Sequence, residues 1–188
     1  MINSKADLRE YLAQDKIQLG ITRKYPRPFT DEIWKYEIIL RKYEYWLNVS
    51  KSYLVKKIGM CFYKLKWHQM GVKFGISIAP NVCGKGLSIA HINCININQN
   101  ASVGDNCRIH EGVTIGASGG SSAPSIGKNV FLGSGCKVMG NVNVPNNCVV
   151  GANAVVVKSF YEEGITLGGV PAKMISKNNS DKFIYWYK

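Results

Sequence analysis

The chain has 188 residues, of which 46% are apolar, and its formal net charge is +12. A chain of this length builds one domain of ordinary size, or one domain with a short appendage, and it holds enough apolar residues for a packed core. A membrane-spanning protein is excluded, because no apolar run approaches the ~20 residues that a membrane helix requires. The charged N-terminus "MINSKADLREYLAQDK" does not read as a signal peptide, so we expect the protein in the cytoplasm.

Residues 1–75 are expected to form an N-terminal helical region. Apolar residues at helical spacing and capping signals predict three helices, over 4–20 with a Ser-x-x-Asp capping box, over 30–50 with Thr30 or Asp31 as N-cap, and over 51–71. The region carries 15 Lys and Arg against 7 Asp and Glu, a net charge of +8. Such a charge fits a nucleic acid, an anionic membrane surface or a phosphorylated substrate, and equally a solvated helix surface.

From residue 97 onward a branched aliphatic residue recurs every six positions. The series is Ile97, Val103, Ile109, Ile115 and, after one step of 11 residues, Ile126, Leu132, Val138, Val144, Val150 and Val156. Four residues after each aliphatic residue lies a smaller slot, filled by Ala101, Cys107, Val113, Val130, Cys136, Val142, Cys148 and Ala154. This hexapeptide period predicts a left-handed parallel β-helix, in which three six-residue flats make one triangular coil. Glycine, which follows five of the ten aliphatic residues, is expected to meet the backbone requirements of the corners.

The 11-residue step is one repeat with five extra residues. Extra residues cannot join a flat without shifting the register, so "GASGGSSAP" is expected to protrude as a loop while the coils continue beneath it. The predicted fold is therefore mainly β, with the N-terminal helical region at 1–75, the β-helix at 76–175 and an aromatic and basic tail at 176–188.

The six cysteines are expected to be reduced and mostly buried thiols. No C-x-x-C pair is present, which argues against a zinc site. Three of the cysteines fall in the small inward slot of the repeat, where they serve as small apolar side chains.

Two histidines are candidates for catalysis. Counting back six residues from Ile97 places His91 where the repeat requires an aliphatic residue, so either this coil is irregular or it opens onto a cleft. His110 follows the inward Ile109 and lies about one coil from His91, which places both imidazoles on the same part of the β-helix. An imidazole can act as a base at neutral pH. His68 is interpreted as structural or solvent-facing.

Four short motifs carry a resemblance to a known family. They are "SIAH" followed by "VTIG", and "GANAVV" followed by "GGVPAK". Over residues 76–175 the chain resembles the hexapeptide-repeat acyltransferases of the serine acetyltransferase type, and its helical front looks most like members encoded for polysaccharide assembly.

The resemblance implies an acetyl-CoA-dependent O-acetyltransferase, similar to serine O-acetyltransferase, with acetyl-CoA as co-substrate and no metal. In that family a histidine at the place of His91 is the general base, and the acceptor hydroxyl attacks the thioester directly. The resemblance further implies a homotrimer or a higher assembly, with the CoA groove between neighbouring subunits. The corresponding residues here are Gly116, Ala117, Ser134 and Ala152, with Lys158 and Lys173 as candidates for pairing with the CoA phosphates.

Two departures from the family leave the acceptor open. The turn that usually supplies an acidic partner for the base has Ser77 at the acidic place and Ala79 where a second histidine is common. The loop also lacks the Arg and His with which serine acetyltransferases engage their amino acid. Asp105 and Glu111 are candidates for the missing carboxylate. A sugar hydroxyl of a surface polysaccharide or its precursor is therefore the alternative to L-serine.

Two other classes of function compete with an enzyme. For a non-catalytic β-helical scaffold, replacement of His91 by Ala would leave every activity unchanged. Nucleic acid is not expected as a partner, because the basic residues lie among helical aromatics rather than in a recognised reading module. Peripheral membrane contact through the basic helices at 31–71 remains open.

Overall fold

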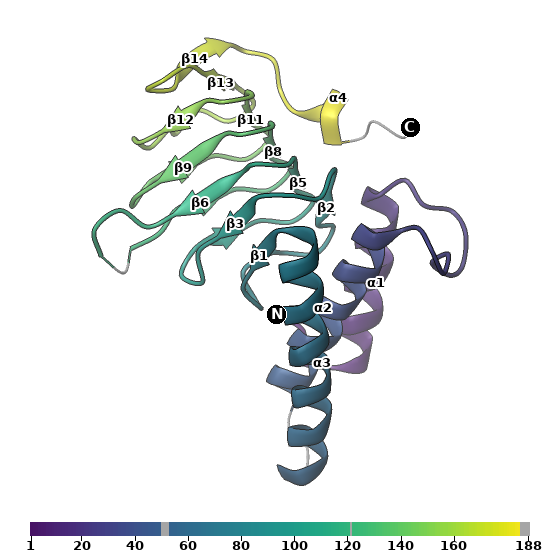
Figure 1. Ribbon diagram of the computed structural model, residues 1–188. Coiled ribbons are helices and arrows are strands. Elements are labelled where there is room, and N and C mark those ends of the chain that lie inside the picture. Colours follow the sequence, from purple (N-terminus) through teal and green to yellow (C-terminus); the bar gives the residue numbers. More distant parts are fainter. Residues whose placement is uncertain (50–52, 121, 185–188) are drawn as a thin grey trace.

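A computed structural model describes residues 1–49, 53–120 and 122–184. Helices lie at one end of a stack of short strands, and a final helical turn returns along the side of the stack (Figure 1). The helices are α1 (Lys5–Gln18), α2 (Glu32–Asn48), α3 (Tyr53–Phe74) and α4 (Asp181–Ile184). The three helices predicted over 4–20, 30–50 and 51–71 are confirmed. Residues 50–52, Ser121 of the loop and residues 185–188 of the tail lie outside the described residues.

The two predicted N-caps differ in the structure. At α1 the capping box is complete, because the Asp7 N–H donates to the Ser4 hydroxyl and the Asp7 carboxylate accepts from the Ser4 N–H, each at 3.0 Å. At α2 Asp31 occupies the cap position, but its side chain makes no capping hydrogen bond. Its carboxylate instead accepts from the Arg23 guanidinium and, at 2.8 Å, from the Arg27 N–H.

The strands form three sheets that wrap into a parallel β-helix, here called the prism. The sheet orders are β1-β3-β6-β9-β12, β4-β7-β10 and β2-β5-β8-β11-β13-β14, and only the pairing of β13 with β14 is antiparallel. The predicted parallel β-helix with an N-terminal helical region is confirmed. The strands are β1 (Ile76–Ile78), β2 (Ser88–Ile89), β3 (Ile95–Ile97), β4 (Ser102–Val103), β5 (Arg108–Ile109), β6 (Thr114–Gly116), β7 (Ser125–Ile126), β8 (Phe131–Leu132), β9 (Lys137–Met139), β10 (Asn143–Val144), β11 (Val149–Val150), β12 (Val155–Val156), β13 (Thr166–Gly168) and β14 (Lys173–Ser176).

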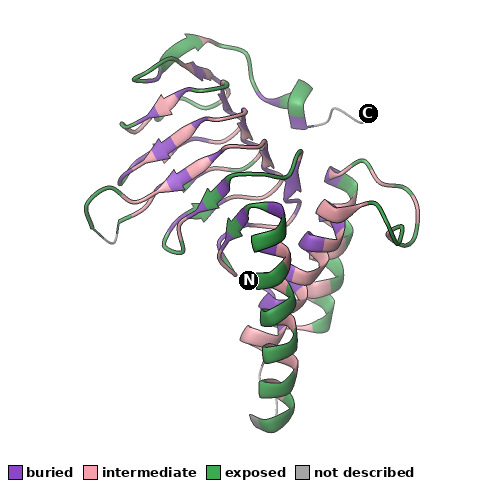
Figure 2. Cartoon of the chain, in the orientation of Figure 1, coloured by how far each residue is buried: buried purple, intermediate pink, exposed green. Residues whose placement is uncertain are grey.

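The interior of the prism is the predicted apolar column (Figure 2). All ten aliphatic residues of the repeat are buried, none more than 4% exposed, and the eight residues of the smaller slot are buried as well. All six cysteines are free thiols; four are buried, whereas Cys61 and Cys94 are exposed. Because each coil buries its side chains against the next, the core runs continuously along the prism.

Glycine in the repeat has a different reason from the predicted one. The glycines after the aliphatic residues do not take a left-handed backbone; they lie where adjacent coils approach closely. A Cβ on Gly104 would lie 2.5 Å from the Gly127 carbonyl oxygen, and one on Gly127 would lie 2.6 Å from the Asn146 nitrogen. Left-handed φ angles occur instead at asparagines, such as Asn106 at 57° and Asn129 at 54°, and at glycines elsewhere in the coils, such as Gly112 at 72°.

These asparagines form a ladder along one edge of the prism. The Gln14 amide of α1 donates to Asn106 at 2.9 Å, Asn106 donates to Asn129 at 3.2 Å, and Asn129 donates to Asn147 at 2.9 Å. The Ser180 N–H then donates to the Asn147 carbonyl at 3.1 Å. The ladder therefore connects the first helix, three coils and the segment before α4.

A buried charge cluster fastens the helices to the first coil. The Arg41 side chain of α2 is fully buried and pairs with Asp15 of α1 at 2.7 Å and with Glu44 at 3.0 Å. It also donates to the carbonyl oxygens of Cys83 at 2.9 Å and Gly84 at 2.5 Å. A guanidinium can satisfy all these acceptors at once because its donors point outward in one plane.

The 11-residue step in the repeat is a protruding loop, as predicted. Ile115 in β6 and Ile126 in β7 are both buried, so the core passes beneath the inserted residues. Figure 1 shows the chain after β6 projecting away from the prism, and residues 118–120 are exposed.

Candidate active site

His91 follows β2 on the turn that leads into β3. Its main chain is held in place two residues earlier, where the Ile89 N–H donates to the buried Glu37 carboxylate of α2 at 3.0 Å. Ile89 pairs with Ile109 twenty residues later, two more than a regular coil, so the turn after β2 is longer than the repeat requires. Ile89 therefore takes the inward place and His91 is exposed. The expectation that His91 occupies an inward aliphatic position is wrong, because the extra residues shift the count.

His110 lies one coil further along, directly after β5. Its N–H donates to the Leu132 carbonyl at 3.0 Å, which continues the ladder of the six-stranded sheet. The two imidazoles meet edge to face, with ring centroids 5.5 Å apart and an interplanar angle of 80°. On its other side the His110 ring packs against Phe131 at 4.9 Å, and Phe131 in turn stacks on Phe183 of α4 at 4.5 Å. The spacing of about one coil thus brings both histidines together.

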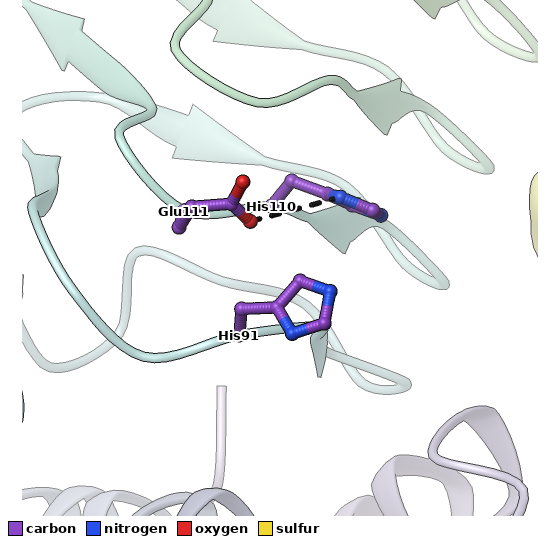
Figure 3. A group of neighbouring side chains, drawn as sticks. All are labelled: His91, His110 and Glu111. Atoms are coloured by element: carbon purple, nitrogen blue, oxygen red, sulfur yellow. Dashed lines mark ion pairs between the residues drawn. The ribbon is translucent and has the colours of Figure 1, made fainter.

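Glu111 and Ser134 complete the group around His110. Figure 3 shows the Glu111 carboxylate directed toward the His110 ring, with Oε2 3.9 Å from Nδ1. The Ser134 hydroxyl, from the next coil, lies 3.4 Å from the same nitrogen. Burial and the positive charge of Arg108 lower the pKa of His110. A lowered pKa keeps this imidazole neutral near pH 7, the form that can accept a proton.

A cavity of about 600 Å³ opens beside His91, between the prism and the helical region. Its walls are mainly apolar, and its charged members are Asp31, Glu32 and Arg108. Small-molecule sites of this kind usually measure ~300–1,000 Å³ and combine apolar walls with a few polar groups. The exposed imidazole of His91 therefore faces a space large enough for a small acceptor.

The residues that the resemblance assigns to CoA lie at two different corners of the prism. Ser134 and Ala152 follow β8 and β11, on the same corner as the histidines, which we call the histidine corner. Gly116 and Ala117 lie where the loop leaves β6, and Lys158 follows β12, on what we call the loop corner.

Within one chain, each strand of the five-stranded sheet begins after the histidine corner and ends at the loop corner. The two corners are therefore separated by the length of a strand, and a single chain does not bring these residues into one groove. Lys173 is exposed on β14, at the far end of the prism from the helices.

The structure separates the two candidates for the missing carboxylate. Asp105 accepts from the Lys85 N–H at 3.1 Å on the turn between β4 and β5, away from both histidines. Ser77 and His91 also line different cavities. Of the two candidates, only Glu111 lies beside the imidazoles.

Several residues of the site lie outside the predicted set. The acidic pair Asp31 and Glu32 and the buried Trp34 come from the helical region, and Phe183 comes from the C-terminal segment. Their approach depends on how distant segments pack, for which the repeat carries no signal. Arg108 could have been predicted from the sequence, because it stands two residues before His110, on the strand that positions that histidine.

His91, His110 and Glu111 also bring potential metal-ligand atoms within 4.8 Å of one another. Two imidazoles and a carboxylate are a donor set that proteins use for zinc. The same three groups can instead act without a metal, as a base with a carboxylate beside it. That the reaction needs no metal stays a prediction.

Comparisons with known proteins agree with this architecture. Residues 123–158 match the family "Bacterial transferase hexapeptide (six repeats)". A serine acetyltransferase from Staphylococcus aureus is 37% identical over 108 residues, which are 55% of this chain and 50% of that protein. The chain thus spans about half the length of the curated relatives it matches.

Two solved structures extend the likeness to the helical region. A serine acetyltransferase in complex with cysteine aligns with a TM-score of 0.72 at 23% identity, covering 98% of this chain and 72% of that one. A serine acetyltransferase from Brucella abortus in complex with coenzyme A aligns with a TM-score of 0.65 at 25% identity, covering 92% of this chain and 67% of that one. By sequence and by fold, this chain resembles the hexapeptide-repeat acyltransferases of the serine acetyltransferase type.

Proposed function

We propose that this chain is an acetyl-CoA-dependent O-acetyltransferase, similar to serine O-acetyltransferase, with His91 as general base. The observation that carries the proposal is the exposed imidazole of His91, which lines a cavity of about 600 Å³ beside a second histidine. The S. aureus relative is named a serine acetyltransferase, and the Brucella abortus structure holds coenzyme A.

The proposed reaction is a direct acyl transfer. His91 removes the proton of the acceptor hydroxyl as the oxygen attacks the thioester carbonyl, the C–S bond breaks, and the thiolate of CoA takes the proton. An alcohol is a poor nucleophile until a base removes its proton, and general-base catalysis contributes roughly 10²–10⁴-fold. No covalent intermediate on the protein is required.

The acceptor is L-serine or, as the second candidate, a sugar hydroxyl of a surface polysaccharide or its precursor. The loop favours the sugar, because its described residues, like its sequence, hold no Arg or His that would engage an amino acid. The cavity has acidic groups at Asp31 and Glu32, but the Asp31 carboxylate is already paired with Arg23. Release of CoA with L-serine, measured against release with nucleotide-sugar or lipid-linked glycan acceptors, separates the two. No release with any acceptor would contradict the proposed activity.

We also propose a homotrimer with the CoA groove between subunits. Its support is the separation of the two corners: a second copy is needed to bring Gly116, Ala117 and Lys158 beside Ser134 and Ala152. Light scattering on the purified protein, with and without CoA, tests this assembly, and a monomer that binds CoA fully would overturn it.

Residence in the cytoplasm and peripheral contact with a membrane stay proposals. Within residues 1–49, 53–120 and 122–184, no helix combines the length and the apolar character needed to cross a bilayer. The described part of α3 holds five lysines and no acidic residue: Lys56, Lys57, Lys64, Lys66 and Lys73. Cosedimentation with anionic vesicles tests the membrane contact. We expect the protein to sediment with the vesicles at low salt and to be released as salt is added, because salt screens the attraction between the lysines and the anionic surface.

A further inference from the structure

One carboxylate oxygen of Glu111, Oε2, is shielded from solvent and, among the described residues, has no hydrogen bond in the resting structure, although the side chain as a whole is 40% exposed. Nδ1 of His110 lies 3.9 Å from this oxygen, beyond hydrogen-bonding distance. Leaving a buried acceptor unpaired is unfavourable, so such an atom requires an explanation.

The carboxyl group is held in its charged form. The nearby Ser134 side chain and the backbone of residue 111 lower the pKa of Glu111. Ring nitrogens of both His91 and His110 lie within 4.8 Å of a Glu111 carboxylate oxygen. The carboxylate therefore faces the two groups that become positively charged when a proton is taken up.

No other described carboxylate takes this place beside the histidines. Ser77 stands where the resemblance places an acidic residue, and it lines a cavity that His91 does not line. Asp105 accepts from the Lys85 N–H on another turn of the prism. Asp31 and Glu32 line the cavity from the helical region, and the Asp31 carboxylate is held by Arg23.

We propose that Glu111 is the positioning residue of the histidine pair and replaces, from the neighbouring coil, the acidic partner that is missing at Ser77. This inference rests on the proposed acetyl transfer. The Glu111 carboxylate stabilises the imidazolium that forms when His91 takes the acceptor proton, and the unpaired oxygen is the acceptor for an imidazole N–H at that stage. Catalytic hydrogen bonds that are long in a resting enzyme commonly shorten in the reacting complex.

The charges around the pair set the direction of the effect. The Glu111 carboxylate favours the protonated form of His110, whereas burial, the positive charge of Arg108 and His91 disfavour it. Asp31 and Glu32 line the same cavity as His91. Removal of the Glu111 charge should therefore lower the pKa of the His110 imidazole, which favours its neutral form.

The test compares three variants of the full chain: Glu111→Gln, Glu111→Asp and the control Glu162→Gln. Glu162 is an exposed residue that pairs with Lys177 at 3.3 Å, so its charge is removed without touching the site. The first readout is kcat/KM as a function of pH. For Glu111→Gln we expect the apparent pKa of the base limb to fall by about one unit and the plateau to fall roughly tenfold, since one unit corresponds to a factor of ten.

We expect Glu111→Asp to restore much of the pH profile and Glu162→Gln to match the wild type, with KM for acetyl-CoA unchanged in all three variants. A lower rate with an unshifted profile in Glu111→Gln would mean that Glu111 only supports the turn. That outcome, or an unchanged Glu111→Gln enzyme, overturns the inference.

A second readout is independent of turnover. The chain has 3 histidines, so the ring protons of His91 and His110 can be followed by NMR titration, with His68→Ala for assignment. We expect the titration midpoint of at least one of the two to move to lower pH in Glu111→Gln. A shifted midpoint in a protein that acetylates nothing would retain the coupling and reject the proposed function. Unshifted midpoints in an active enzyme would retain the function and reject the role of Glu111.

Discussion

The prism and the helical region are stabilised in different ways. The prism buries a repeated apolar column, in which Ile109 and Leu132 are fully enclosed and each contact is to the next coil. The helical region is joined to the prism through the buried guanidinium of Arg41, which pairs with Asp15 and Glu44 and donates to the carbonyl oxygens of Cys83 and Gly84. Apolar packing tolerates small changes because its contacts are numerous and non-directional. A buried charge cluster does not, because loss of one member leaves the others unpaired.

The candidate site lies at the junction of these two regions. His91 belongs to the prism, but the cavity that it faces is closed on the other side by residues of the helical region, such as Glu32 and Trp34. The two histidines of the proposed site thus stand on the prism, and the opposite wall of the cavity belongs to the helical region.

The largest effect is expected for His91→Ala, which tests whether the junction is the active site. Removal of the general base should lower kcat/KM for acetyl transfer by about 10²–10⁴-fold, while neither region unfolds. CoA release measured together with thermal unfolding checks both parts. His68→Ala is the matched control, since His68 is exposed on α3, and it should keep full activity. Retained activity in His91→Ala would leave the scaffold interpretation standing.

Arg41→Ala addresses the attachment of the helical region. We expect the free energy of unfolding to fall by about 3–5 kcal/mol, because Asp15 and Glu44 would remain buried without their partner. Denaturant unfolding measures the loss, and Arg9→Ala, a change at an exposed position of α1, should have little effect. If the two variants prove equally stable, the charge cluster does not hold the helices to the prism.

Ile109→Ala tests the apolar column directly. Truncation of a fully buried isoleucine is expected to lower the free energy of unfolding by about 2–5 kcal/mol. The same substitution at Ile175, which is 65% exposed on β14, should change it by less than ~0.5 kcal/mol. A small loss at Ile109 would show that the coils collapse around the cavity, contrary to a tightly packed column.

The smallest effect is expected at the first helix. Ser4→Ala removes the hydroxyl that accepts from the Asp7 N–H and should lower the free energy of unfolding by about 1 kcal/mol. Ser4→Asp keeps an acceptor at the cap and should stay close to the wild type. Hydrogen exchange of the first turn of α1 measures both variants; equal protection in Ser4→Ala and wild type would mean that tertiary contacts alone hold this turn.

The repeat made most of the prism predictable. Residues such as Ile115 and Ile126 obey a local period, and the loop between them follows from the length of the step. The same logic failed at His91, because two extra residues in its turn break the period before the regular coils begin. An irregular coil cannot be placed by counting from its neighbours.

The site was only partly predictable for a related reason. His91 and His110 are separated by about one coil, so their proximity follows from the repeat. The approach of Glu32 and Phe183 depends on long-range packing of the helices and of the C-terminal segment, which no local pattern encodes. Gly116 and Ser134 were predicted from the resemblance as parts of one groove, and their separation becomes visible only when the three sheets are assigned.

The asparagine ladder has a consequence for building longer proteins of this kind. Asn129 donates to Asn147 and accepts from Asn106 while holding a left-handed backbone, so each rung supplies both halves of an amide pair. An extra 18-residue coil could therefore be inserted into the prism without interrupting this ladder only if the coil carried its own asparagine at the same corner. A glycine at that corner would permit the left-handed backbone but would supply no side-chain amide. We would then expect the elongated protein to be less stable at the inserted coil.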